Sequence, residues 1–153
     1  MKHLLFIAII LFLSSCDTMY KDETMIFNDY MNESYDFQIE KDLSYCFLII
    51  PKFACIGCVT NIIVNSDYNK LFPNHMMAYL ISNESEHLDP LYTRDDVKVF
   101  FDSNGSIDDL IYSFANMGII IYEKGLISYI GNLNKISDLE DLSEIINSIS
   151  IET

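Results

Sequence analysis

The stretch YCFLIIPKFACIGC, residues 45–58, decides the fold class. Its first six residues, Tyr45 to Ile50, form a continuous apolar run, which is typical of a strand buried on both faces of a sheet. Pro51 ends this run. The segment from Cys55 to Phe72 then changes period, because its apolar residues fall on one face of a helix; they are Val59, Ile62, Ile63 and Leu71. The pattern therefore predicts a strand and a helix, with a Cys-x-x-Cys pair at their junction.

The same alternation of strand and helix continues to the end of the chain. Further strands are predicted at His75–Ile81 and Val97–Phe101, and a hairpin at Ile119–Tyr122 and Leu126–Ile130 with Gly125 in its turn. Residues 82–96 are polar and read as a loop. Two amphipathic helices are predicted, Ile107–Phe114 and Leu139–Ile149, each after a capping box that begins at Ser106 or Ser137. This order predicts an α/β sandwich of three layers over residues 36–153, with a mixed central sheet and a C-terminal hairpin and helix.

The first 15 residues have the pattern of a secretory signal peptide. Lys2 and His3 precede Leu4–Leu13, ten residues without a polar side chain, and this run is too short to span a bilayer as a helix. The next residues, Leu13-Ser14-Ser15-Cys16, resemble the lipobox of bacterial lipoproteins. The resemblance implies cleavage before Cys16, a diacylglycerol on its sulfur and an acyl chain such as palmitate on the new N-terminus.

A lipidated Cys16 would place the rest of the chain on a cell membrane or outer membrane, outside the cytoplasm. Several acyl chains on one residue anchor a protein stably, and disulfides persist in such compartments. Residues 16–35 are rich in acids and are predicted to form a flexible tether. Within them Lys21-Asp22-Glu23 resembles a short signal that sends some lipoproteins of Gram-negative bacteria to the cell surface.

Composition excludes two broad classes. An apolar fraction of 50% with only 21% charged residues does not fit a chain that is disordered throughout. Nine Lys and Arg against 23 Asp and Glu give a net charge of −14, so no basic face for nucleic acid is expected. Loss of Lys2 with the signal peptide would leave eight basic residues and a net charge of 8 − 23 = −15.

The position of Cys55 and Cys58 favours dithiol chemistry over metal binding. The N-terminus of a helix carries partial positive charge, which stabilises a thiolate. Cys55 is therefore expected to lie exposed at the helix tip, and Cys58, one turn further, to face the packed side. No second cysteine pair accompanies them, and His75 and His87 are not placed as ligands, so no metal is expected. Cys46 fits a small buried side chain in a strand.

At this point the chain resembles the membrane-tethered, thioredoxin-like thiol–disulfide oxidoreductases over roughly residues 45–149. The similar segments are Phe53–Cys58, the strand and turn Val97–Gly105, and the hairpin Ile119–Gly131. The resemblance implies that Cys55 is the attacking thiolate and Cys58 the resolving thiol. It also implies partners that are protein thiols or disulfides of the cell envelope, and no cofactor.

Two departures from that family leave other functions open. The family's cis-proline would fall at Asn116 or Met117, and its buried acid in the first strand has no counterpart in residues 46–50. One alternative is a redox-inactive thioredoxin-like lipoprotein for binding or assembly. Another is a peroxiredoxin-like thiol peroxidase, because Pro51-Lys-Phe-Ala-Cys55-Ile-Gly-Cys58 is similar to that family's motif. Cys58 would then be peroxidatic, with Arg94 as its candidate arginine.

Overall fold

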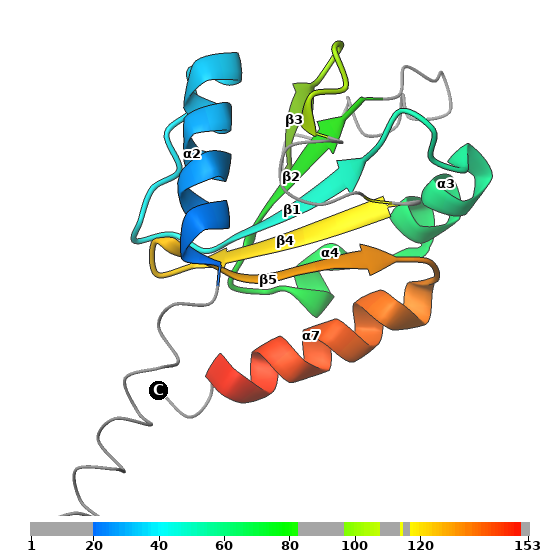
Figure 1. Ribbon diagram of the computed structural model, residues 1–153. Coiled ribbons are helices and arrows are strands. Elements are labelled where there is room, and N and C mark those ends of the chain that lie inside the picture. Colours follow the sequence, from blue (N-terminus) through cyan, green and yellow to red (C-terminus); the bar gives the residue numbers. More distant parts are fainter. Residues whose placement is uncertain (1–19, 83–96, 108–113, 115–116, 151–153) are drawn as a thin grey trace, which may run out of the picture.

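Five strands form one mixed sheet in the computed structural model, whose described residues are 20–82, 97–107, 114 and 117–150. The strands are β1 (Tyr45–Ile50), β2 (Met76–Ile81), β3 (Val97–Phe101), β4 (Met117–Glu123) and β5 (Leu126–Leu133). Their order in the sheet is β3-β2-β1-β4-β5 (Figure 1). β1, β2 and β3 run parallel, whereas β4 is antiparallel to both β1 and β5. The predicted mixed sheet and its C-terminal hairpin are thus confirmed.

Strand β1 is the centre of the sheet and separates two apolar cores. Phe47 pairs with Ala78 of β2 on one side and with Ile120 of β4 on the other. Because side chains alternate along a strand, Cys46, Leu48 and Ile50 point to one face and Tyr45, Phe47 and Ile49 to the other. All six residues are buried, as the continuous apolar run predicts.

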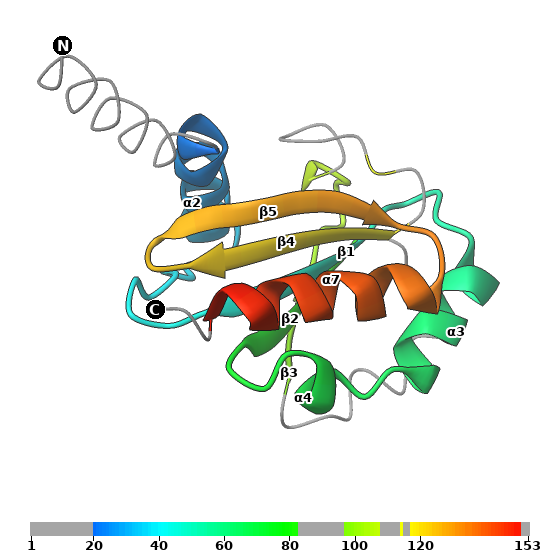
Figure 2. The same ribbon diagram turned by 90° about the horizontal axis from the view of Figure 1, so that it is seen from below.

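Helices cover both faces of the sheet. On the face of Leu48 lie α3 (Ile56–Asn65), α4 (Tyr68–Leu71) and α7 (Ile136–Ser150), and α7 runs beneath the hairpin strands in Figure 2. On the face of Phe47 lies α2 (Lys21–Tyr35). The structure therefore confirms an α/β fold with a mixed sheet, a C-terminal hairpin and a final helix. Most of the helix expected at Ile107–Phe114 lies outside the described residues.

Two details of the predicted helices are wrong. The single helix expected from Cys55 to Phe72 is broken, because Asp67 caps a new helix by accepting a hydrogen bond from the Lys70 N–H at 3.2 Å. Ser137 does not cap the last helix, which already begins at Ile136. Instead the Asp138 carboxylate accepts from the backbone N–H of Asn134 at 2.9 Å and of Lys135 at 3.2 Å.

The tether expected over residues 16–35 is wrong from Lys21 onward, where the chain forms α2. Thr24, Phe27 and Met31 recur at helical spacing and are buried against the sheet. The helix ends because Asp36 adopts a left-handed conformation, with φ of 50°, and the Phe37 N–H returns to the Met31 carbonyl. The acids that indicated a tether occupy the solvent side of this helix.

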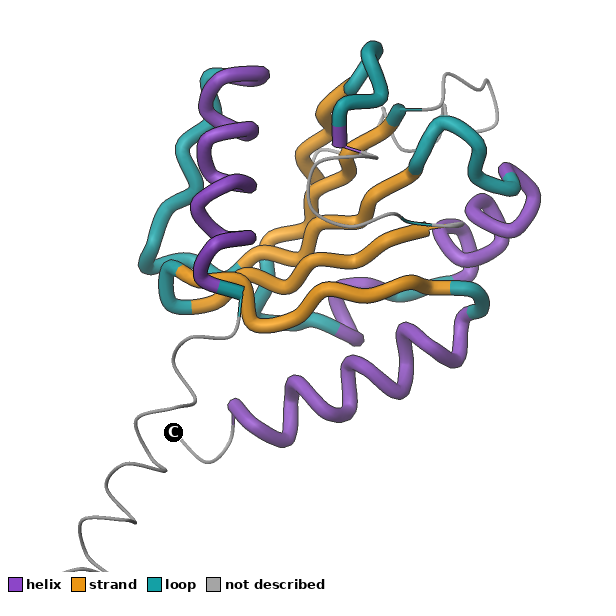
Figure 3. Tube along the Cα trace, in the orientation of Figure 1, coloured by secondary structure: helices purple, strands orange, loops and turns teal. Residues whose placement is uncertain are grey.

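Helix α2 crosses the sheet from one edge to the other. Near its start, Thr24 Oγ1 accepts a hydrogen bond of 2.9 Å from the N–H of Ile127 in β5. Near its end, the Tyr35 ring packs on Phe100 of β3, with the ring centroids 5.1 Å apart. A loop then returns the chain to the start of β1, as the teal segment after α2 shows in Figure 3. Residues 21–35 therefore belong to the folded domain.

The described helices include none with both the length and the apolar character needed to cross a bilayer.

Replacing Phe27 by Ala tests whether α2 is part of the folded core. Phe27 is fully buried and stacks edge-to-face on Phe47, with ring centroids 5.0 Å apart. A buried Phe→Ala change costs about 3–5 kcal/mol, so the midpoint of urea unfolding should fall strongly. Met25→Ala in the same helix is the control, because Met25 is 60% exposed and should change the midpoint little. Equal, small effects of the two substitutions would restore the tether interpretation.

Candidate functional site

The cysteine pair lies where the chain leaves the centre of the sheet. β1 ends at Ile50, and a tight turn follows, in which the Ala54 N–H donates to the Pro51 carbonyl at 3.0 Å. Cys55 is the N-cap of α3, and its carbonyl accepts the first helical hydrogen bond, from the Val59 N–H at 2.9 Å. No side chain caps this end of α3. The predicted strand, its end at Pro51 and the helix start at Cys55 are therefore confirmed.

Cys55 and Cys58 form a disulfide, with their Cα atoms 5.3 Å apart. One helical turn separates the two residues, which suits a bridge of this kind. Both side chains are exposed, so the expectation that Cys58 faces the packed side is wrong. The buried side of α3 is formed by Val59, Ile62 and Ile63, with Ile56 packed at its edge, and Cys58 falls outside it.

The surface around the disulfide is open. Phe53, two residues before Cys55, is 89% exposed, and Lys52 and Gly57 are exposed as well. A Cβ built on Gly57 would meet no atom within 4 Å. A second protein can therefore approach both sulfur atoms, which thiol–disulfide exchange requires. An aromatic ring beside them offers apolar contact to such a partner.

Cys46 is separate from this pair. It is fully buried in β1 and reduced, and burial raises the pKa of its thiol well above the ordinary range. This agrees with the interpretation of Cys46 as a small apolar side chain of the core. Cys16 and Arg94 lie outside the described residues. No group of three or more metal-binding side chains occurs in the part of the chain that the structure describes.

The acid that the family places in its first strand has no counterpart in β1, but another strand supplies a buried carboxylate. Asp102, just after β3, is only 5% exposed. Its two oxygens accept from the Ser82 hydroxyl at 3.2 Å, the Ser106 hydroxyl at 2.9 Å and the Ile107 N–H at 2.8 Å. Asp102 is thus held by the turn that it starts, and it serves the fold rather than the disulfide.

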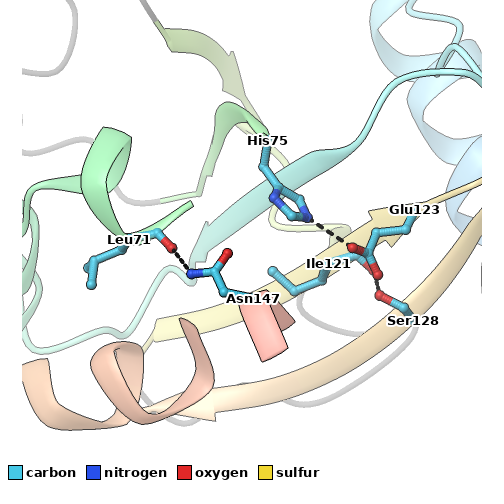
Figure 4. A network of polar contacts seen from close by, with 6 residues as sticks. All are labelled: Leu71, His75, Ile121, Glu123, Ser128 and Asn147. Atoms are coloured by element: carbon cyan, nitrogen blue, oxygen red, sulfur yellow. Dashed lines mark hydrogen bonds and ion pairs between the residues drawn. The ribbon is translucent and has the colours of Figure 1, made fainter. Parts of the chain in front are cut away.

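Sequence reasoning missed a second polar pair, which lies at the opposite end of the strands (Figure 4). His75, directly before β2, is buried, and its Nε2 lies 3.3 Å from Oε1 of Glu123 at the end of β4. Nearby, Asn147 of α7 donates to the Leu71 carbonyl at 3.0 Å and ties α7 to α4. The sequence carries no signal for the pair, because 48 positions separate two residues that only the sheet brings together.

The environment of Glu123 favours its charged form. The His75 imidazole, as the first cause, and then the Ser128 hydroxyl and Lys124 lower the pKa of Glu123, and burial opposes them only in part. A carboxyl group whose pKa is lower in the folded chain stabilises the fold above its unfolded pKa. The Glu123 carboxylate should therefore stabilise the fold to an extent that depends on pH.

No model of a known protein family matches this chain. A comparison with curated proteins finds no match either.

Glu123→Gln should change how stability depends on pH. The charged carboxylate stabilises the wild type above the unfolded pKa of ~4.3, and this contribution is lost as the pH falls through the lower folded value. The wild type should therefore exceed the variant in urea resistance near neutral pH, and the gap should close in acid. Glu144→Gln, at an exposed position of α7, is the matched control and should follow the wild type. A gap that stays constant with pH would contradict the role of Glu123.

Proposed function

We propose that this protein is an extracytoplasmic, lipid-anchored thiol–disulfide oxidoreductase that works through Cys55 and Cys58. The observation that carries the proposal is the solvent-exposed disulfide at the uncapped N-terminus of α3. Structural disulfides are commonly buried and closed to attack, whereas exchange needs an accessible sulfur and a stabilised thiolate. The exposure of the pair meets the first condition and the helix N-terminus favours the second, so both support thiol–disulfide exchange at Cys55 and Cys58.

The arrangement of the sheet supports a thioredoxin-like domain as the scaffold. A parallel β1-α3-β2 unit is joined in one sheet to an antiparallel hairpin, β4-β5, and α7 follows on the same face as α3. The cysteine pair occupies the junction of the central strand and the first helix of this unit. A fold does not by itself fix a function, so the argument for exchange rests on the disulfide and its surroundings.

The proposed reaction consists of two exchange steps. In the reduced protein the Cys55 thiolate attacks a disulfide of the partner, forms a mixed disulfide and releases one partner thiolate. Cys58, deprotonated, then attacks the Cys55 sulfur, closes the Cys55–Cys58 disulfide and releases the second partner thiolate, which takes up a proton. Two electrons pass to the partner. The same steps in reverse oxidise a partner dithiol, and the reduction potential of the pair selects the direction.

Cys55 is the better candidate for the attacking sulfur. It is the N-cap residue, so the N–H groups and the partial positive charge of the helix start lie closest to it. Since Cys58 is exposed too, burial does not distinguish the two sulfurs. The assignment therefore depends on the greater thiolate character of Cys55.

The second candidate is a redox-inactive binding or assembly lipoprotein with the same fold. It is favoured by the first strand, in which six apolar, buried residues leave no acid to act as a proton acceptor near the pair. The buried Asp102 does not replace that acid, because its oxygens are occupied by the turn after β3.

Trapping experiments separate these functions. Cys58→Ser should accumulate mixed disulfides between Cys55 and partner proteins, whereas Cys55→Ser should trap none. In the reduced wild type, alkylation at neutral pH should reach Cys55 first, and Cys46 should react only after unfolding. A reduction potential below about −300 mV would mark the bridge as structural. Faster labelling of Cys58 would favour the peroxidase alternative, and two unreactive cysteines would favour the binding module.

The lipid anchor makes an independent prediction. Cys16→Ser should move the protein from the membrane fraction to the soluble fraction, because the sulfur that would carry the diacylglycerol is missing. Incorporation of labelled palmitate into the wild type, and none into the variant, checks the chemistry directly. If the variant still pellets with membranes and the wild type takes up no label, the lipobox interpretation is wrong.

A further inference from the structure

The sheet has two ends with different contents. Because β1, β2 and β3 are parallel, their carboxyl ends share one end of the sheet, here called the carboxyl pole. The Cys55–Cys58 disulfide follows β1 at this pole. The other end, here called the amino pole, holds the start of β1 and the hairpin turn Lys124–Gly125, since Tyr45 pairs with Tyr122. Figures 1 and 2 agree that α3 and this hairpin turn lie at opposite ends of the strands.

The described part of the chain begins at the amino pole, at Tyr20. The Thr24 hydroxyl donates to the Tyr20 carbonyl at 2.6 Å, and the same oxygen accepts from the Ile127 N–H at 2.9 Å. Ile127 comes two residues after Gly125, and the side chain of Lys41 lies against Gly125. Tyr20 is therefore held beside the hairpin turn, at the end of the sheet away from the disulfide.

The length of chain before Tyr20 limits how far this pole can move from a lipid anchor. Cys16 precedes Tyr20 by four residues, which span at most ~14 Å when fully extended. Strand β1 alone separates the two poles by ~17 Å at ~3.3 Å per residue. Lipid on Cys16 would thus keep the amino pole at the membrane surface, and only a domain lying on its side could bring the disulfide down to it.

Negative charge disfavours contact between the membrane and the two broad sides of the domain, which are covered by α2 and α7. The outer side of α2 exposes Asp22, Asp29 and Glu33, and that of α7 exposes Glu140, Asp141 and Glu144. Either side would place three carboxylates against headgroups that are themselves negative. The amino pole carries mixed charge, Lys41 and Lys124 with Glu40, Asp42 and Glu123, and the start of α2 adds Lys21, Asp22, Glu23 and the exposed Met25 and Ile26. Because three lysines stand beside these acids, lipid repels this pole less than it repels the two broad sides.

From this geometry we propose that the disulfide is presented away from the membrane and exchanges with cysteines of soluble extracytoplasmic proteins, not with cysteines at the lipid surface. The inference rests on the lipid anchor and the exchange activity of the proposed function, and adds the class of partner. The exposed Phe53 beside the pair suits a mobile or unfolded segment of such a partner, which can offer an apolar side chain next to its cysteine.

Fluorescence quenching tests the orientation. The lipidated full-length protein is placed in vesicles of phosphatidylethanolamine and phosphatidylglycerol that contain a quencher at headgroup depth. One fluorophore is attached to Cys55 in Cys58→Ser, and in separate proteins to Lys124→Cys or Asn104→Cys, both in a Cys55→Ser, Cys58→Ser background. Residue 124 lies at the amino pole and should be quenched several-fold more than residue 55. Residue 104 should be quenched as little as residue 55, because Asn104 is exposed in the turn after β3, at the carboxyl pole. Equal quenching, or stronger quenching at residue 55, overturns the proposed orientation.

Exchange rates test the partner class. Reduced wild-type protein in these vesicles is offered a disulfide-bonded fluorescent peptide, either free in solution or fused to a transmembrane helix that holds the disulfide at headgroup level. The soluble peptide should be reduced several-fold faster. An insertion of a flexible Gly/Ser segment between Asp17 and Tyr20 should speed only the reaction with the anchored peptide. Equal wild-type rates overturn the inference.

The same experiments distinguish failure of the inference from failure of the proposed function. No reaction with either peptide rejects the exchange activity. A protein that does not float with the vesicles rejects the anchor. Either result also removes the inference, whereas flotation and exchange without the predicted asymmetry reject only the orientation.

Discussion

The six residues of β1 lie between β2 and β4 in the sheet and between two layers of helices, so none of their side chains is more than 1% exposed. A strand buried on both faces cannot leave backbone groups or polar side chains without partners, and this one has an apolar side chain at every position. The rest of the molecule is arranged around it. The alternate side chains of β1 define the two cores, and its direction defines the two poles of the sheet.

The position of the cysteine pair is a consequence of this strand. Pro51 and the turn to Ala54 end β1, and α3 starts at once on the face of Leu48. Ile56, Val59 and Ile62 turn one side of α3 to the core, and Cys55 and Cys58 fall outside that side and are exposed. The rigid sheet thus holds a disulfide at a surface that a second protein can reach. A pair held on a flexible loop would not combine access with a fixed helix end.

The opposite pole has a different chemistry. There α2 begins and is held to β5 by the Thr24 hydroxyl. His75 and Glu123 come together under the same end of the sheet, where the pKa of Glu123 is lowered, first by the imidazole. Polar contacts thus join elements at this pole, as Asp102 does after β3 at the other, and the acidic outer sides of α2 and α7 connect the two poles. Under the proposed function, the amino pole is the end held at the membrane and the carboxyl pole the end that faces a partner.

Local patterns determined most of the strands. The apolar run of β1, the limits of β3 and the Lys124–Gly125 turn, where both residues have positive φ, follow from side-chain type and turn chemistry within a few residues. The position of Cys55 at the start of a helix also follows from the local sequence. Tertiary structure decided what depends on distant partners. Residues 21–35 have acids that indicate a tether, yet Phe27 and Met31 become core residues because the sheet offers them an apolar face. Cys58 is exposed because the packed side of α3 is set by Val59, Ile62 and Ile63, and His75 meets Glu123 only through the pairing of the strands. These features depend on where elements end in space, which no local pattern of side chains encodes.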